Sequence, residues 1–376
     1  MNLNLLCPIN NLGYGIHSFN MLKALKDNDV NISLAVYGQP DITNKTVSDY
    51  VHGCTPGLNP ENYTLHIFHD AHLPVDKMKK LIAFSVFETS RLKQDVIDKL
   101  NQVDFIFTTT EEHRKLLKVN GVTKDIHVVN EGVDPEIFNM DEVVPLLDTG
   151  KYTFMLLGKT EKRKNTGMAI TSFIESMHSN NVALICHTYS PFIKDSQKLT
   201  NWTEIDISLF GYVLDTENDL YMKYTNNTSD IYFTKPGIPT EQMKHLYHSA
   251  NVGISFSSAE GWGLPETELM ACGVPMIITN VIGHREYITN LPVFQELIIN
   301  PTEVELANDG KFFHGDVGIW AKFKSEDLQE KLEYAYTNGI GNEKSKELSN
   351  YIIERYNWNN SAIEVKRIIK EYSNEN

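Results

Sequence analysis

The feature that most constrains the fold is a regular alternation of short apolar runs with helical runs. "LNLLCPI" leads into the helical pattern "GIHSFNMLKALKDND", and later apolar runs such as "KLIAFSVFE" continue the rhythm. A second series starts at "YTFMLLGK" and reaches "NVGISFSS". Strands separated by helices in this way indicate parallel sheets covered on both faces. The sequence therefore predicts an α/β protein.

The length of the chain sets the number of domains. At 376 residues the chain is too long for one typical core. We expect two doubly wound, Rossmann-like parallel-sheet domains that face each other across a cleft, the first over residues 1–145 and the second over 150–355. A closing helix over 357–376 is expected to pack back toward the first domain. The segment 191–229 shows no clear period and yields no element.

Composition narrows the functional classes. The formal net charge of −15 opposes long-range attraction to nucleic acid or anionic lipid. No apolar run is long enough to cross a membrane, and the first ten residues do not fit a signal peptide. The four cysteines have no paired spacing, which favours free thiols over disulfides or zinc. We therefore expect a cytoplasmic protein with no transmembrane segment and no metal.

The stretch "EGWGLPETELMACGVPMIITN" carries two carboxylates, Glu260 and Glu268, eight positions apart. Pro265 is well placed to open a helix, and Gly273 to end it. One glutamate then lies in a loop after a strand and the other lies at a helix start, where ligands bind in parallel-sheet proteins. For Glu266, in the same first turn, we expect only a favourable interaction with the helix dipole.

A basic turn follows the first strand of the second series. "LLGKTEKRKNTG" places Gly158 at a strand end, followed by Lys159, Lys162, Arg163 and Lys164. Clustered cations in an acidic protein are suited to a diphosphate, through charge-assisted hydrogen bonds. The alternative is a solvated basic turn.

Three places in the first half offer weaker candidates. Gly13 and Gly15 flank Tyr14 before a helix, where backbone N–H groups can approach a phosphate, although a plain tight turn fits equally. His69 and Asp70 follow one strand and Glu88 follows the next, so they can meet substrate hydroxyls. For the histidines of "LHIFHDAHLP" (His66, His69 and His72), exposed loop positions are the alternative, and a strand end followed by proline does not keep all three on one face for zinc.

Taken together, these motifs resemble the family 4 glycosyltransferases, which are retaining, metal-independent enzymes of the GT-B fold. The acidic stretch from Glu260 to Glu268 resembles their E-x7-E motif, and Lys159 and Lys164 match the spacing of their basic pair. "VVNEGVDPEIF" resembles the segment before their interdomain crossing. "IGHREYI" differs, because His284 stands where the family commonly has a second glycine.

The resemblance implies a role for each matching residue. Glu260 is implied to lie beside the transferred sugar, Glu268 to bind the donor ribose, and Lys159 and Lys164 to hold the diphosphate. The family's first-domain histidine has no secure counterpart, so His69 is only a candidate for catalysis. The expected donor-binding set is completed by these residues: Gly13, Gly15, Gly158, Arg163, Gly261, Trp262, Gly263 and Leu264. Asp70 and Glu88 are assigned to the acceptor side.

The resemblance implies a retaining transferase that moves a sugar from a nucleotide-sugar donor to a hydroxyl acceptor in surface-glycan or polysaccharide assembly. Three alternatives stay open. The acceptor can be a modified DNA base, as with some phage enzymes of this fold, although the charge opposes nucleic acid. The chain can also be a non-catalytic sugar-nucleotide or glycan-binding protein, or a sugar-nucleotide epimerase. The sugar, the base, the acceptor and the oligomeric state do not follow from the sequence.

Overall fold

The computed structural model describes residues 1–189, 206–339 and 341–374. The chain divides into two compact units. Unit 1 consists of Met1–Asp134, Asp316–Gly318 and Arg355–Asn376, and unit 2 consists of Pro135–Gly315 and Ile319–Glu354. The chain thus passes into unit 2 after Asp134, upstream of the expected 1–145 boundary, and the C-terminal helix belongs to unit 1.

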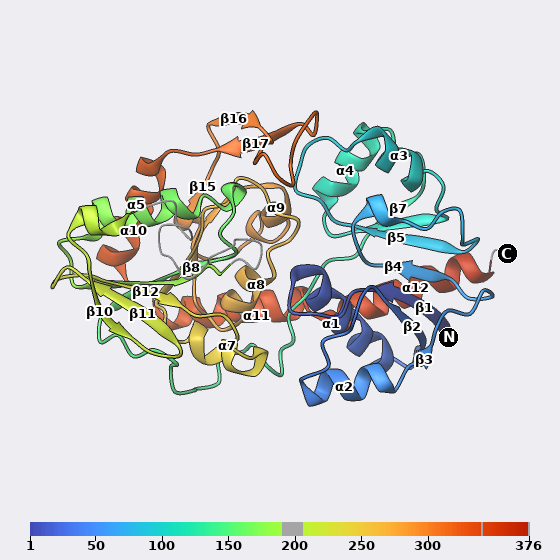
Figure 1. Ribbon diagram of the computed structural model, residues 1–376, viewed down its shortest axis with the longest axis horizontal. Coiled ribbons are helices and arrows are strands. Elements are labelled where there is room, and N and C mark those ends of the chain that lie inside the picture. Colours follow the sequence, from blue (N-terminus) through green and yellow to red (C-terminus); the bar gives the residue numbers. More distant parts are fainter. Residues whose placement is uncertain (190–205, 340, 375–376) are drawn as a thin grey trace. The chain divides into compact units, whose positions relative to one another are not determined.

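Unit 1 is built on a seven-stranded sheet in the order β3-β2-β1-β4-β5-β6-β7, in which every strand pairing is parallel (Figure 1). Its central strands are buried along their whole length, as expected for a sheet covered on both faces. The strands are β1 (Asn2–Cys7), β2 (Asn31–Val36), β3 (Thr55–Pro56), β4 (Thr64–His66), β5 (Leu81–Ser85), β6 (Phe105–Thr108) and β7 (Ile126–Val128).

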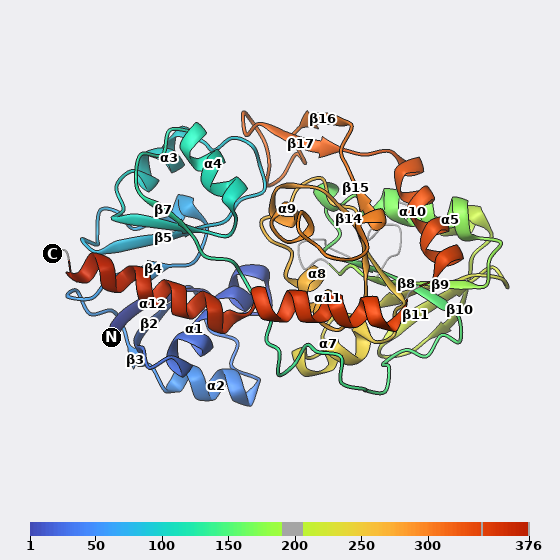
Figure 2. The same cartoon turned by 180° about the vertical axis from the view of Figure 1, so that it is seen from behind.

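The helices of unit 1 connect these strands, and the last helix of the chain joins them. The C-terminal helix lies along α1 (Figure 2). Thr110 caps α4 by accepting a hydrogen bond from the backbone N–H of His113, so that helix starts directly after β6. The helices are α1 (Gly13–Asp27), α2 (Lys45–His52), the short 3-10 helix η1 (Asp70–His72), α3 (Gln94–Leu100), α4 (Glu111–Val119) and α12 (Trp358–Asn374).

Unit 2 holds an eight-stranded sheet in the order β10-β11-β12-β9-β8-β13-β14-β15. The pairings are parallel from β12 to β15, whereas β10 and β11 form an antiparallel edge. The strands are β8 (Tyr152–Leu157), β9 (Val182–His187), β10 (Val213–Glu217), β11 (Tyr221–Thr225), β12 (Asp230–Thr234), β13 (Val252–Ser255), β14 (Met276–Thr279) and β15 (Ile298–Ile299), and β16 (Glu303–Leu306) pairs with β17 (Ile319–Lys322) as a separate ribbon.

The helices of unit 2 alternate with its parallel strands. They are η2 (Lys162–Lys164), α5 (Thr166–Met177), η3 (Ile207–Phe210), α7 (Thr240–Tyr247), α8 (Leu264–Ala271), α9 (Ile282–Ile288), η4 (Gln295–Leu297), α10 (Ser325–Asn338) and α11 (Asn342–Arg355). Within the stretch 191–229, which yielded no sequence prediction, residues 206–229 contribute η3, β10 and β11, while 190–205 lie outside the described residues.

The prediction of two Rossmann-like α/β domains is confirmed, since each unit has its own largely parallel sheet connected by helices. In the described part of the chain, no helix combines the length and the apolar character needed to cross a membrane.

Candidate active site

Two loops of unit 2 are brought together because the strands that precede them are neighbours. β13 pairs with β8 in parallel, so the turn after β8 and the loop after β13 leave the sheet at the same edge. The first carries Lys159 to Lys164 and the second carries Glu260. Ligands bind at this edge in open α/β sheets. The topology therefore explains why a basic turn and an acidic motif a hundred residues apart belong to one site.

Backbone hydrogen bonds fix the two loops to each other. The N–H of Ser258 donates to the carbonyl of Arg163 at 2.7 Å. Asn165 adopts a left-handed conformation with φ 50°, and its amide donates to Phe256 O and Ser258 Oγ, both at 2.9 Å. Gly158 has φ 102°, a conformation that favours glycine. The positions of the basic side chains are thus set by the main chain.

The centre of the site is a buried ion-pair cluster. Lys164 Nζ lies 2.5 Å and Arg163 Nη1 lies 3.0 Å from Glu260 Oε1. The exposed fractions of Glu260, Arg163 and Lys164 are only 5%, 4% and 7%. Burial alone raises the pKa of Glu260, but Arg163 and Lys164 more than reverse this and hold its pKa well below the usual range. Glu260 is therefore a carboxylate, and two of the predicted residues meet it directly.

Glu266 corrects an expectation from the sequence. It was expected only to interact with the helix dipole from the first turn, and it is also fully buried among other polar side chains. Ser255 Oγ donates to its Oε1 at 2.8 Å, while Lys164 Nζ and His284 Nε2 lie 3.8 and 3.9 Å from the same oxygen. The sequence did not predict these contacts because first-turn position alone does not show which face of the helix is buried.

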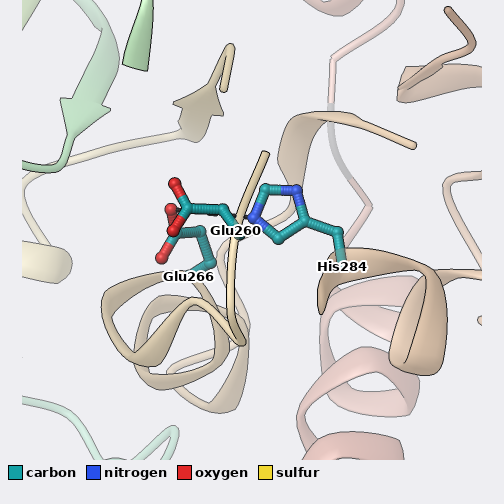
Figure 3. A group of neighbouring side chains, drawn as sticks. All are labelled: Glu260, Glu266 and His284. Atoms are coloured by element: carbon teal, nitrogen blue, oxygen red, sulfur yellow. Dashed lines mark ion pairs between the residues drawn. The ribbon is translucent and has the colours of Figure 1, made fainter. Parts of the chain in front are cut away.

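Among the residues that the structure describes, Glu260, Glu266 and His284 form a group that could hold a metal ion, since one ligand atom from each lies within 4.8 Å of the others. Figure 3 shows the two carboxyl groups side by side with the imidazole directed toward them. The ammonium of Lys164 already lies against both carboxylates. Its pKa is lowered by burial and raised more strongly by Glu260 and Glu266, with a net rise, so it stays charged. These residues fit a lysine better than a metal ion.

Glu268, the second carboxylate of the motif, is half-buried on α8. Tyr247, on α7, donates a hydrogen bond from its hydroxyl to Glu268 Oε2 at 2.8 Å, which fixes the carboxyl group. Burial raises the pKa of Glu268 to about 8, against the lowering effect of the Tyr247 hydrogen bond. Glu268 is thus a carboxyl group whose charge changes close to neutral pH.

We expect donor binding to depend on pH through Glu268. Its carboxylate form accepts hydroxyl hydrogen bonds, and with a pKa of about 8 that form grows as pH rises from 7 to 9. The KM for the donor should therefore fall over this range, and Glu268→Gln should give a KM that is higher and flat. Initial rates at varied donor concentration measure both. A wild-type KM that is constant across this pH range would contradict the prediction.

Several predicted donor-binding residues of unit 2 contact other polar groups of the protein. Arg163 points inward, donating to the carbonyl of Ala259 and pairing with Glu161 at 3.2 Å as well as with Glu260. Lys159 pairs with Glu161 at 3.1 Å. With a side chain 37% exposed, Lys159 is the more accessible of these cations. The cluster predicted for a diphosphate is therefore divided between a buried part and an accessible part.

The glycine-rich loop between the carboxylates is also largely internal. Gly261, Trp262, Gly263 and Leu264 are buried. Trp262 packs edge-on against Tyr287 at 5.3 Å, and Tyr287 donates to its carbonyl at 3.1 Å. Gly263 is the N-cap residue of α8 at φ 102°, and an added Cβ there would lie 2.9 Å from the Tyr287 hydroxyl. The indole thus packs inside unit 2 against Tyr287, and contact of this loop with a donor stays a prediction.

In unit 1, the predicted glycine turn lies at the start of α1. An added Cβ on Gly15 would lie 2.2 Å from the carbonyl oxygen of Asn10, so the turn requires glycine there, while Gly13 has open space around it. Tyr14, between them, donates to the carbonyl of Val86 at 3.0 Å. This close approach ties the α1 turn to the end of β5 at the carboxyl edge of the sheet.

The remaining candidates of unit 1 gather at the same edge. His69 is exposed and packs edge-on against Tyr14 at 4.7 Å. Asp70 is buried, Ser85 Oγ donates to its Oδ2 at 2.5 Å, and burial raises its pKa to about 7. Glu88 is half-buried. His69 and Asp70 are therefore adjacent in sequence but differ in environment, one accessible and the other inside.

A buried pair in unit 1 was absent from the predicted site. His17 Nδ1 lies 2.7 Å from Glu131 Oε1, and both residues are buried. The His17 ring packs against Phe84 at 4.4 Å and Trp358 at 5.3 Å. His17 lies in "GIHSFNMLKALKDND" and Glu131 in "VVNEGVDPEIF". Their pairing across more than a hundred residues follows only from the fold. The pair joins α1 to the segment after β7 and to α12.

Comparison with known proteins identifies the family. The model of the family described as glycosyl transferases group 1 matches residues 141–355, more than half of the chain. O-antigen chain mannosyltransferase B of Escherichia coli is 34% identical over 68 residues, which cover 18% of this chain and 17% of that protein. This match is local and covers far less than two thirds of the relative's length.

Solved structures resemble the whole chain. Sucrose-phosphate synthase from Thermosynechococcus elongatus has a TM-score of 0.67 at 12% identity, covering 100% of both chains. HepE of Anabaena, solved in complex with UDP and glucose, has a TM-score of 0.65 at 11% identity, covering 99% of this chain and 100% of that one. At such identities the likeness shows the fold, which is the GT-B fold. The chain belongs to the glycosyl transferases group 1 family.

Proposed function

We propose that this protein is a retaining, metal-independent glycosyltransferase of family 4 type, which moves a sugar from a nucleotide-sugar donor to a hydroxyl acceptor. The observation that carries the proposal is the buried contact of Lys164 with Glu260 at the carboxyl ends of β8 and β13. A charged lysine and an ionised carboxylate, held at a ligand-binding edge, are suited to a diphosphate leaving group and a positively charged sugar.

In the proposed reaction, Lys159 and Lys164 bind the donor diphosphate and Glu268 accepts hydrogen bonds from the ribose. The bond between the anomeric carbon and the diphosphate oxygen breaks, and its electron pair stays on the diphosphate, where the lysines stabilise the charge. The acceptor oxygen forms its bond to the anomeric carbon on the same face. Its proton passes to the leaving diphosphate oxygen, so the configuration is retained.

The Glu260 carboxylate has the electrostatic role. It stabilises positive charge that develops at the anomeric centre, and its low pKa keeps it ionised throughout the physiological range. We assign acceptor recognition to unit 1, with His69, Asp70 and Glu88 as the candidates. A role in surface-glycan or polysaccharide assembly is supported by the local similarity to a mannosyltransferase of O-antigen chains.

A ligand panel tests the donor assignment. The melting temperature of the protein would be measured with UDP, GDP and ADP and with their sugar derivatives, because a ligand of the native state must raise it. We expect one nucleotide series to stabilise wild-type protein and to stabilise Lys164→Met much less. A panel in which no nucleotide or nucleotide sugar raises the melting temperature would contradict the proposal.

The proposed mechanism also predicts activity without a divalent ion. Lys164 occupies the place between Glu260 and Glu266, where a metal ion would otherwise be held. In the proposed mechanism, lysine therefore neutralises the leaving group instead of a metal ion. Turnover in excess EDTA should therefore equal turnover in untreated enzyme, measured as nucleotide release. Activity that is lost in chelator and restored by Mg²⁺ or Mn²⁺ would show that a metal takes part.

A further inference from the structure

Glu266 is a buried carboxylate that accepts its hydrogen bond from a neutral group. It is fully buried, and the hydroxyl of Ser255 donates to Oε1. A single neutral donor does not offset the cost of burying a carboxylate, which requires a nearby cation or several hydrogen bonds. The cation beside it is Lys164, whose Nζ lies 3.8 Å from Oε1. Glu266 is therefore paired electrostatically with a residue proposed to bind the leaving group.

His284 approaches the same oxygen from α9. Its Nδ1 lies 2.9 Å from the carbonyl oxygen of Thr279, which can only accept, so Nδ1 carries the proton. Burial lowers the pKa of His284, against the raising effects of Glu266 and Glu260, and the ring is neutral. Nε2 then presents a lone pair toward Glu266 at 3.9 Å. The imidazole fills space beside the carboxylate without supplying a charge, so it does not replace Lys164 as the partner.

Lys164 thus lies between two carboxylates at different distances, 2.5 Å from Glu260 and 3.8 Å from Glu266. Arg163 faces Glu260 as well. When a diphosphate binds Lys164, the ammonium must weaken its contact with Glu260, which then becomes available to the sugar. Loss of one partner is less costly if a second carboxylate stays close to the ammonium. Glu266 is placed to be that second partner.

We propose that Glu266 is a positioning residue that holds Lys164 while the ammonium moves from Glu260 to the leaving diphosphate. This inference rests on the proposed function and extends it to a residue outside the E-x7-E pair. Without the Glu266 charge, Lys164 stays on Glu260, so both the leaving group and the developing positive charge lose stabilisation. The effect should fall on the chemical step more than on donor binding.

The test compares Glu266→Gln, which keeps the shape and the Ser255 contact, with a matched control in the same unit. Asp230 is also buried and pairs with Lys151 at 2.8 Å. It lies at the start of β12, at the strand end opposite to the carboxyl ends that carry the candidate site. For Glu266→Gln we expect kcat to fall about tenfold or more, with a donor KM within about threefold of wild type. Asp230→Asn should lower the melting temperature and leave kcat unchanged.

A pH profile separates positioning from a general loss of structure. Because Glu266 contributes to the raised pKa of Lys164, the alkaline limb of kcat should move to lower pH in Glu266→Gln and stay in place in Asp230→Asn. Equal kcat and an unshifted limb in Glu266→Gln would overturn the inference. So would a loss of kcat that Asp230→Asn reproduces.

Titration calorimetry with UDP, GDP and ADP on wild-type protein and the same variants distinguishes failure of the proposed function from failure of the positioning role of Glu266. If none of the three binds wild-type protein, the proposed function fails before Glu266 is tested. If one binds and wild type turns over, then unchanged turnover in Glu266→Gln counts against the positioning role alone.

Discussion

Replacing Lys164 with methionine is expected to lower kcat by about a thousandfold, the scale on which removal of one group stabilising transition-state charge acts. Lys164 Nζ lies 2.5 Å from Glu260, is nearly inaccessible and keeps its charge. Methionine has a similar length but no charge, so it cannot stabilise the leaving diphosphate. Initial rates of nucleotide release at saturating donor measure the change.

The same substitution should destabilise the protein, since it leaves Glu260 and Glu266 buried without this partner. Breaking a buried pair by removing one member costs about 3–5 kcal/mol. The double variant Lys164→Met with Glu260→Gln removes charge from both members, and it should regain much of the melting temperature while staying inactive. Recovery of activity together with stability would mean that Lys164 acts only on the fold.

Glu260→Gln is expected to lower kcat by about a hundredfold to a thousandfold while leaving nucleoside diphosphate affinity equal or higher. The amide keeps the shape of the carboxylate but cannot stabilise positive charge on the sugar. Lys164 also loses its closest anion and becomes more available to the diphosphate. Calorimetric titration with the nucleoside diphosphate and single-turnover rates measure the two effects separately.

Glu268→Gln provides the contrast, because Glu268 lies on α8, is held by Tyr247 and is assigned to the ribose. Its loss should appear mainly in donor KM. The account requires the two glutamates to differ in this way. If both variants changed kcat and KM in the same proportion, the separate roles assigned to sugar and ribose would be wrong.

The fold was predicted well from the sequence because strands and helices leave periodic patterns of apolar residues. Apolar strands alternating with helices gave the two parallel-sheet domains, and Gly263 and Gly273, both with positive φ, bound the helix that was predicted around Pro265. The hairpin of β10 and β11 was not predicted. Its strand β10 is exposed along its whole length, so its sequence carries no alternation between a buried and a solvated face.

The site was predicted less completely, for physical reasons that differ between residues. Glu260 and Lys164 were chosen from the acidic stretch and the basic turn, and the structure brings them into contact because β8 and β13 are neighbours. Glu266 was misjudged because its burial depends on Ser255 and Lys164, which come from other elements. Trp262 packs on Tyr287, a contact that the sequence did not show, and its donor contact stays a prediction. The His17–Glu131 contact lies beyond any local pattern.

The most direct test of the account is the release of nucleoside diphosphate from a panel of nucleotide sugars, compared between wild-type protein and Glu260→Gln. The panel would include GDP-mannose, UDP-glucose and UDP-N-acetylglucosamine, each with and without candidate glycan acceptors. We predict release from one donor by wild type, faster with its acceptor, and almost none by the folded Glu260→Gln variant. Equal release by wild type and Glu260→Gln, or an isomerised sugar nucleotide in place of free nucleotide, would contradict the proposed transfer.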